Sequence, residues 1–147
     1  MNKPWETVVA VADIENRRAL AAILASFGLD AMCVSTAGQC RELIDKGEVK
    51  LVFSGQFFPD GDYHTILRAC QACHEQPSVV LAAPRTSAIA DQAIALGAFD
   101  VVSIPYRPTD VEWTFLKLRR SRQAAAAASS HAFASPRSID TLSRRAS

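Results

Sequence analysis

Short apolar runs alternate with stretches of helical periodicity along most of the chain. Residues 8–11 form a continuous apolar run, which is typical of a strand covered on both faces. The next apolar residues recur at positions i, i+3, i+4 and i+7, and they predict a helix that ends at Gly28, where a left-handed backbone costs little. They are Leu20, Ile23, Leu24 and Phe27.

The same alternation repeats to about residue 120. Further strands are predicted at residues 31–34, 51–53, 79–82 and 101–102. The helices between these strands carry apolar stripes, and two of the helices are expected to end at Gly47 and Gly97. The stripes are Cys40, Leu43 and Ile44; Ile66, Leu67, Cys70 and Cys73; and Ile89, Ala93, Ile94 and Leu96.

A last helix is predicted from a capping-box pattern, in which Thr109 and Glu112 each satisfy a backbone amide at the helix start. Val111, Phe115 and Leu118 supply its apolar face. Strands that alternate with helices indicate an α/β fold with a parallel sheet between helices, because parallel strands need right-handed crossover connections. In such a sheet the ligand or chemical site lies at the carboxyl ends of the strands.

The end of the chain has a different composition. From about Ser121 it is rich in alanine, serine and arginine. The alanines at 124–128 extend the last helix by a turn or two at most, because little beyond them can bury enough apolar surface to offset chain entropy. We therefore expect one domain at residues 1–122 and a disordered tail at residues 123–147.

Composition excludes several classes of function. The chain is 49% apolar and 21% charged, close to the average of soluble proteins. No apolar run approaches the roughly 20 residues of a membrane span, and residues 1–16 do not resemble a secretory signal, so we expect a cytoplasmic protein without membrane contact. A net charge of +1 offers no broad attraction for nucleic acid. No glycine-rich phosphate loop follows a strand, so no cofactor is predicted.

Three strings resemble the receiver domain of two-component response regulators, and the likeness covers about residues 5–122. They are Val-Val-Ala-Val-Ala-Asp-Ile-Glu-Asn-Arg-Arg-Ala-Leu, Leu-Val-Phe-Ser-Gly-Gln-Phe-Phe-Pro, and Ala-Leu-Gly-Ala-Phe-Asp-Val-Val-Ser-Ile-Pro-Tyr. The third is the most specific, because receivers carry Gly-Ala-x-Asp, a strand, and then Lys-Pro-Phe or Lys-Pro-Tyr. The resemblance implies a doubly wound, flavodoxin-like receiver fold with five parallel strands in the order 2-1-3-4-5.

Receivers accept a phosphoryl group on an aspartate at the end of the third strand, and acidic residues at the end of the first strand hold the Mg²⁺ that neutralises it. The resemblance implies that this pocket is degenerate here. The acidic pair becomes Ala12 and Asp13, the acceptor becomes Gly55, the Thr or Ser after the fourth strand becomes Ala82, and the Lys before Pro105 becomes Ile104. We expect no catalytic residue and no metal centre.

The residues that relay phosphorylation in receivers are absent as well. The aromatic switch position on the fifth strand is Val101. Ser54 is a poor substitute for an acceptor at position 55, because successive strand side chains point to opposite faces. Pro105, whose preceding peptide bond is often cis in this family, is expected to serve the scaffold.

Two metal or cofactor alternatives remain open. Asp60 or Asp62, in the loop after the third strand, could join Asp13 in a weak cation site, although hard cations need several oxygens in a defined geometry. The string Cys70-Gln71-Ala72-Cys73-His74 matches covalent haem attachment, and a zinc site could use its thiols with His74 or His64. We favour buried cysteines on the apolar stripe of the helix, and we also expect Cys33, in a strand, and Cys40, on the inner face of a helix, to be core residues.

Two functional hypotheses follow. The first is a phosphorylation-independent regulatory module, not an enzyme, that contacts a regulatory protein or a second copy through its fourth helix, fifth strand and fifth helix. Phe99, Tyr106 and Trp113 are the interface candidates, because aromatic residues commonly anchor interfaces. The second is a protein that binds a cofactor or small molecule at the carboxyl ends of its strands.

Overall fold

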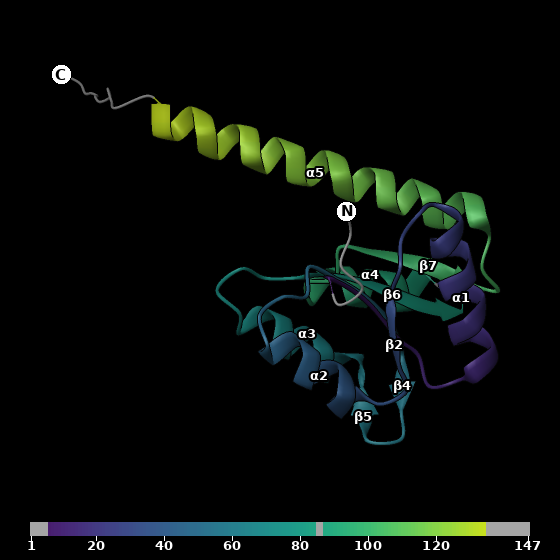
Figure 1. The fold of residues 1–147 in the computed structure, drawn as a ribbon. Coiled ribbons are helices and arrows are strands. Elements are labelled where there is room, and N and C mark those ends of the chain that lie inside the picture. The colour runs from purple at the N-terminus through teal and green to yellow at the C-terminus, as the bar shows by residue number, and fades with distance from the viewer. Residues whose placement is uncertain (1–5, 85–86, 135–147) are drawn as a thin grey trace. The chain divides into compact units, whose positions relative to one another are not determined.

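The computed structural model describes residues 6–84 and 87–134 of the 147-residue chain. In this part of the chain, five parallel strands form one sheet in the order β2-β1-β3-β6-β7 (Figure 1). They are β1 (Thr7–Ala10), β2 (Met32–Val34), β3 (Leu51–Gly55), β6 (Ser78–Pro84) and β7 (Asp100–Ile104). Because β4 and β5 are a separate short hairpin, this is the predicted order 2-1-3-4-5, and the fold class is confirmed.

Helices connect the strands and cover both faces of the sheet. They are α1 (Ile14–Ser26), α2 (Ala37–Asp45), α3 (Tyr63–Gln71), α4 (Ser87–Ala95) and the start of α5 (Pro108–Ala134), up to Thr114. Side chains that alternate along the strands divide the core into two layers. Val8 and Ala10 of β1 pack with buried residues of α2 and α3, whereas the intervening Val9 is directed to the opposite face and is fully buried there.

The helix ends follow the glycine signals. Gly28, Gly47 and Gly97 all have positive φ angles and follow the last turns of α1, α2 and α4. The glycines end these helices because a left-handed backbone conformation there is free of a Cβ clash.

A short antiparallel hairpin that the sequence pattern did not predict follows β3. It consists of β4 (Phe57–Phe58) and β5 (Gly61–Asp62). The hairpin lies at the carboxyl edge of the sheet, between the end of β3 and the start of α3, so it stands beside the predicted pocket.

The last helix differs from the prediction at both ends. It begins at Pro108, where the amides of Asp110 and Val111 donate to Arg107 O at 3.0 and 3.2 Å. Proline suits the first helical position because the amide it lacks has no helical partner there, so the capping-box start at Thr109 was wrong. The helix continues to Ala134, past the expected boundary at residues 122 and 123. Residues 135–147 of the expected tail lie outside the described residues.

The chain falls into two compact units, residues 1–114 and 115–147. The sheet and its pocket belong entirely to the first unit. Within the described ranges, no helix combines the length and the apolar character needed to cross a membrane.

Several apolar residues expected in the core are exposed. Ile94 and Leu96 of the fourth helical stripe are 47% and 39% exposed, while Ala93 is fully buried. Cys33 is also exposed, because its strand β2 is an edge of the sheet and is short. The apolar patterns identified the helix and the strand correctly, but they predicted more buried residues on each than the structure has.

A substitution at Gly97 tests the turn after α4. A Cβ at Gly97 would lie 2.6 Å from Gln71 Nε2, which donates to Leu96 O at 2.9 Å, and φ at Gly97 is 116°. We expect Gly97→Ala to lower the free energy of unfolding by about 2–3 kcal/mol, through backbone strain and loss of that hydrogen bond. Gly28→Ala is the matched control, because φ there is 83° and a Cβ would meet nothing within 4 Å; its cost should be about 1 kcal/mol. Equal costs in urea titrations would contradict this account.

Candidate functional site

The carboxyl ends of β3 and β6 bring two of the predicted pocket residues together. Gly55, at the end of β3, is paired in register with Ala82 of β6, and Ala82 is in turn paired with Val102 of β7. Both Gly55 and Ala82 are buried. Gly55, at the position of the receiver acceptor, and Ala82, at the position of the receiver Thr or Ser, are therefore adjacent. Neither residue carries a polar side chain.

The neighbour of Gly55 on the first strand is apolar as well. A Cβ built on Gly55 would lie 3.6 Å from Val11 Cα and 3.8 Å from Val11 Cγ1, which are ordinary van der Waals distances. Val11 is 4% exposed and follows directly on β1. Sequence reasoning missed this residue as part of the pocket, although the unbroken apolar run at 8–11 was a signal for it. The pocket has room for a small side chain at position 55, and a valine faces that space.

The one carboxylate among the predicted pocket residues serves a helix. Asp13 is the N-cap of α1, and its Oδ2 accepts from the amide of Asn16 at 2.8 Å. Both Ala12 and Asp13 are exposed. Arg17, one turn into α1, donates to Val11 O at 2.7 Å and to Ala12 O at 3.2 Å. Two residues of α1, Asn16 and Arg17, thus fix the loop that follows β1: Asn16 through the Asp13 carboxylate, and Arg17 through the two carbonyls before Asp13.

Asp60 and Asp62 are also held at helix starts. Asp60 Oδ1 and Oδ2 accept from the amides of Ala37 and Gly38, each at 2.9 Å, so the hairpin caps α2. These hydrogen bonds, with Gly38 the stronger contributor, lower the pKa of Asp60. Asp62 caps α3 by accepting from the amide of His64 at 3.0 Å, and it also contacts the His64 ring at 3.1 Å.

The weak cation site considered from the sequence therefore has no support in the geometry. Its three candidate carboxylates each cap a different helix. In the described residues, no group of three or more potential metal ligands gathers at any point. Capping is the reason, because it uses the carboxylate oxygens that a cation would need.

The fifth sheet strand ends in the expected turn. The peptide bond between Ile104 and Pro105 is cis, as the resemblance implied. Val101, at the switch position, is half-buried and packs against the core that α2 and α3 cover. Ser54 is fully buried and its hydroxyl donates to Gly55 O at 2.8 Å, which occupies its proton within the strand.

The three interface candidates differ in exposure. Trp113 is 57% exposed, whereas Phe99 and Tyr106 are half-buried. The Tyr106 hydroxyl is buried, and its burial, together with the negative charge of Asp13, raises the pKa of Tyr106 to about 12. Tyr106 is therefore partly packed within the fold, and Trp113 is the candidate with most surface available to a partner.

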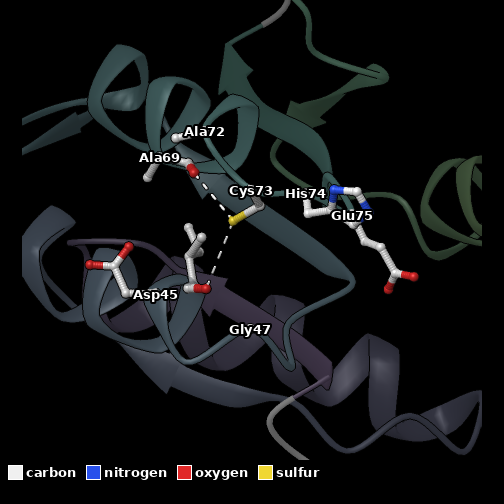
Figure 2. A pocket seen from close by; sticks show the side chains of 8 residues that line it. Asp45, Gly47, Ala69, Ala72, Cys73, His74 and Glu75 are labelled. Atoms are coloured by element: carbon white, nitrogen blue, oxygen red, sulfur yellow. Dashed lines mark hydrogen bonds between the residues drawn. The ribbon is translucent and has the colours of Figure 1, made fainter.

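The two cysteines of the haem-like string differ in burial, and only Cys70 lies within a helix. Cys40 and Cys70 are buried, and burial raises the pKa of each thiol to about 12. Cys73 is half-buried just beyond α3, and its thiol donates to Ala69 O at 3.4 Å (Figure 2). His74 is exposed. Protonated, buried thiols are poor metal ligands and poor nucleophiles, so Cys40 and Cys70 have a packing role.

The cavity shown in Figure 2 lies away from the strand ends. Its volume is about 450 Å³, and its lining includes Asp45 and Gly47 at the end of α2 and Cys73 at the end of α3. Since each helix starts at the carboxyl edge of the sheet and ends at the amino edge, this cavity is on the side opposite Gly55 and Ala82. It is a separate feature from the pocket that the sequence predicted.

Comparisons with known proteins identify the fold. The sequence matches no protein-family model, and it matches no curated protein. Solved structures of receiver domains are similar in shape. A signal receiver domain from Vibrio parahaemolyticus has a TM-score of 0.71 and 20% identity, covering 83% of this chain and 96% of its own.

Two further structures carry information on their own ligands and partners. The receiver domain of the sensor histidine kinase PA1611 from Pseudomonas aeruginosa, with a magnesium ion coordinated in its active site cleft, has a TM-score of 0.65 and 13% identity over 72% of this chain and 89% of its own. The receiver domain of the response regulator Ssk1 from Saccharomyces cerevisiae, in a co-crystal with the phosphotransfer protein Ypd1, has a TM-score of 0.64 and 11% identity over 72% and 82%. At these identities the likeness shows the receiver fold.

The cap made by Asp60 predicts a pH dependence. A lowered folded pKa means that Asp60 stabilises the fold above the ordinary aspartate pKa of 3.8, and that this contribution is lost as the pH falls through the folded value. We expect Asp60→Asn to be less stable than the native chain near pH 7, with the difference shrinking toward pH 2.5 in urea titrations. Asp91→Asn, at an exposed position of α4, is the control and should change little. A difference independent of pH would refute the capping role of the charge.

Proposed function

We propose that this chain is a regulatory module with a receiver fold that works by protein contact, without phosphorylation and without enzymatic activity, in a pathway of the two-component type. The observation that carries the proposal is the replacement of the acceptor position by Gly55, with Val11 as its nearest neighbour on the first strand. Phosphoryl transfer to a carboxylate needs the carboxylate itself and a metal to neutralise the incoming oxygens. Position 55 has no carboxylate, and the nearby Asp13 is engaged as the cap of α1.

The remaining pocket positions support the same proposal. Ala82 is buried where receivers carry a hydroxyl, and Ile104 stands where they carry a lysine. Loss of the carboxylates alone would leave an ammonium without a partner, and loss of the lysine alone would leave carboxylates repelling one another. Loss of both sets keeps the pocket free of unpaired charge, which favours a stable scaffold over an impaired phosphorylation site.

The partner surface we propose lies on the helices beside β7. α4 packs on β7, and Thr114 of α5 donates to Asp100 of β7 at 3.0 Å, so both helices flank this strand. Trp113, Ile94 and Leu96 are exposed on these two helices. Large apolar and aromatic side chains at the surface are typical interface anchors. The occupant is a regulatory protein or a second copy of the chain, and the Ssk1 receiver in complex with Ypd1 is a precedent for a protein partner.

The alternative hypothesis, a cofactor or small molecule at the carboxyl ends of the strands, has less support. The side chain nearest to Gly55 is the apolar Val11, and the carboxylates of the neighbouring loops serve helix starts. No specific observation at that edge favours a ligand.

The absence of phosphotransfer is directly testable. The native chain incubated with acetyl phosphate and Mg²⁺ should show no mass increase of one phosphoryl group, because position 55 has no side-chain oxygen. A receiver domain with an intact acidic pocket, treated in parallel, confirms that the reagent is active. A stoichiometric, acid-labile adduct on the native chain would remove the basis of the proposal.

The proposed partner surface is tested by exchanging its most exposed aromatic residue. Trp113→Ala should weaken self-association in sedimentation equilibrium, or binding of an isolated partner, by at least about tenfold, which is the usual cost of losing an aromatic anchor. Phe57→Ala is the matched control, because Phe57 is 69% exposed but lies on the hairpin at the carboxyl edge of the sheet. Equal effects of the two substitutions would place the interface elsewhere.

A further inference from the structure

A groove with an unusual distribution of charge lies between α2 and α3, at a distance from the pocket around Gly55. It comprises two adjoining cavities of about 390 and 450 Å³ that share Asp45, Ala69 and Ala72 in their linings. The smaller cavity is also lined by Arg41, Thr65 and Arg68. The larger one continues toward the ends of the two helices, where Cys73 lines it (Figure 2).

The groove follows from helical periodicity. Thr65, Arg68, Ala69 and Ala72 are spaced i, i+3, i+4 and i+7, which places them on one face of α3 next to the buried stripe. Arg41 and Asp45 are four residues apart and share a face of α2. The two alanines leave the space between the helices open where longer side chains would fill it.

Among the residues that the structure describes, no carboxylate forms an ion pair with either arginine of the smaller cavity. The ion pairs found in the described part of the chain join Lys50 to Glu6 and His64 to Asp62, and neither Arg41 nor Arg68 takes part in one. Asp45 is the single carboxylate among the residues that line the smaller cavity, so the formal charge of this lining is positive. Two arginines and Thr65 thus line one concave surface.

We propose that this groove binds a small organic anion. Its phosphate or carboxylate head pairs with Arg41 and Arg68, and its apolar body lies along Ala69 and Ala72 toward Cys73. Guanidinium groups suit this role because they donate paired hydrogen bonds to the oxygens of such heads. The volume of the two cavities is in the range of small-molecule sites, about 300–1,000 Å³.

The orientation follows from the charges along the groove. Asp45 lines both cavities, whereas Glu75 lines only the larger one, and the carboxyl ends of α2 and α3 add the negative ends of their helix dipoles there. An anionic head is repelled from that end and held at the arginine end. This site is independent of the pocket around Gly55 and of the surface beside β7, so it stands or falls separately from the proposed function.

The test uses the full chain and four probes: phenyl phosphate, benzoate, benzyl alcohol and inorganic phosphate. Binding is followed by chemical-shift changes of backbone amides and by calorimetry. We expect saturable binding of phenyl phosphate or benzoate with a dissociation constant on the order of 0.1–1 mM, with the largest shifts at residues of α2 and α3. Whichever of the two binds more tightly identifies the preferred head group.

Variants separate the head from the body. Arg41→Gln and Arg68→Gln should each weaken binding about tenfold, and the double variant should abolish it. Ala72→Leu, at an exposed position, should obstruct the body and weaken phenyl phosphate while leaving inorganic phosphate unchanged. Arg18→Gln, at an exposed position of α1, is the matched control for a general loss of positive charge and should have no effect.

Several results would overturn the proposal. Without saturable binding of either anion, both arginines are simply solvated surface groups. Equal binding of benzyl alcohol would show that the charge is irrelevant, and equal binding of inorganic phosphate that ignores Ala72→Leu would show an adventitious ion only. An effect of Arg18→Gln equal to that of Arg41→Gln would reduce the result to net charge.

Discussion

Burial of the central strands on both faces is the constraint on which the rest of this structure depends. Val9, Val52, Phe53 and Val80 are fully buried in β1, β3 and β6. Burying each such side chain stabilises the fold by about 1.5–3 kcal/mol, but only if helices cover both faces of the sheet. Each connection must therefore cross over with a helix, and all the helix starts then gather at the carboxyl edge of the sheet. The position of the pocket follows from this topology, whatever chemistry the pocket contains.

The same topology allows a sheet of this fold to form whatever residues occupy the pocket. Gly55 is the last residue of β3 and Ala82 lies within β6, so only a few sheet positions face the pocket. The carboxylates of the neighbouring loops are engaged as helix caps, and Val11 extends the core beyond β1. In the function we propose, apolar packing and capping take the place of ionic chemistry at this edge of the sheet.

The sequence predicted what depends on local periodicity and missed what depends on distant partners. The apolar runs and the glycines after α1, α2 and α4 identified the elements and their order. Thr36 and Gln39 form a local capping box at the start of α2, but the additional contact from Asp60 could not be found this way, because Asp60 lies 22 and 23 residues from the amides it accepts from. Local pattern also failed at Pro108, where a proline outweighed a capping-box string, and at Ile94 and Leu96, whose exposure depends on which helices lie alongside. Val11 belongs to the apolar run at residues 8–11, but it was predicted only as a strand residue and not as part of the pocket.

The attachment of the hairpin to α2 has a consequence for signalling. Any rearrangement of the β4–β5 hairpin must break both hydrogen bonds of Asp60 and expose the first amides of α2. These two hydrogen bonds favour the observed conformation of the loop. Under the function we propose, we therefore expect the domain to act at this edge as a rigid adaptor, with an output set by its local concentration and by access to its partner.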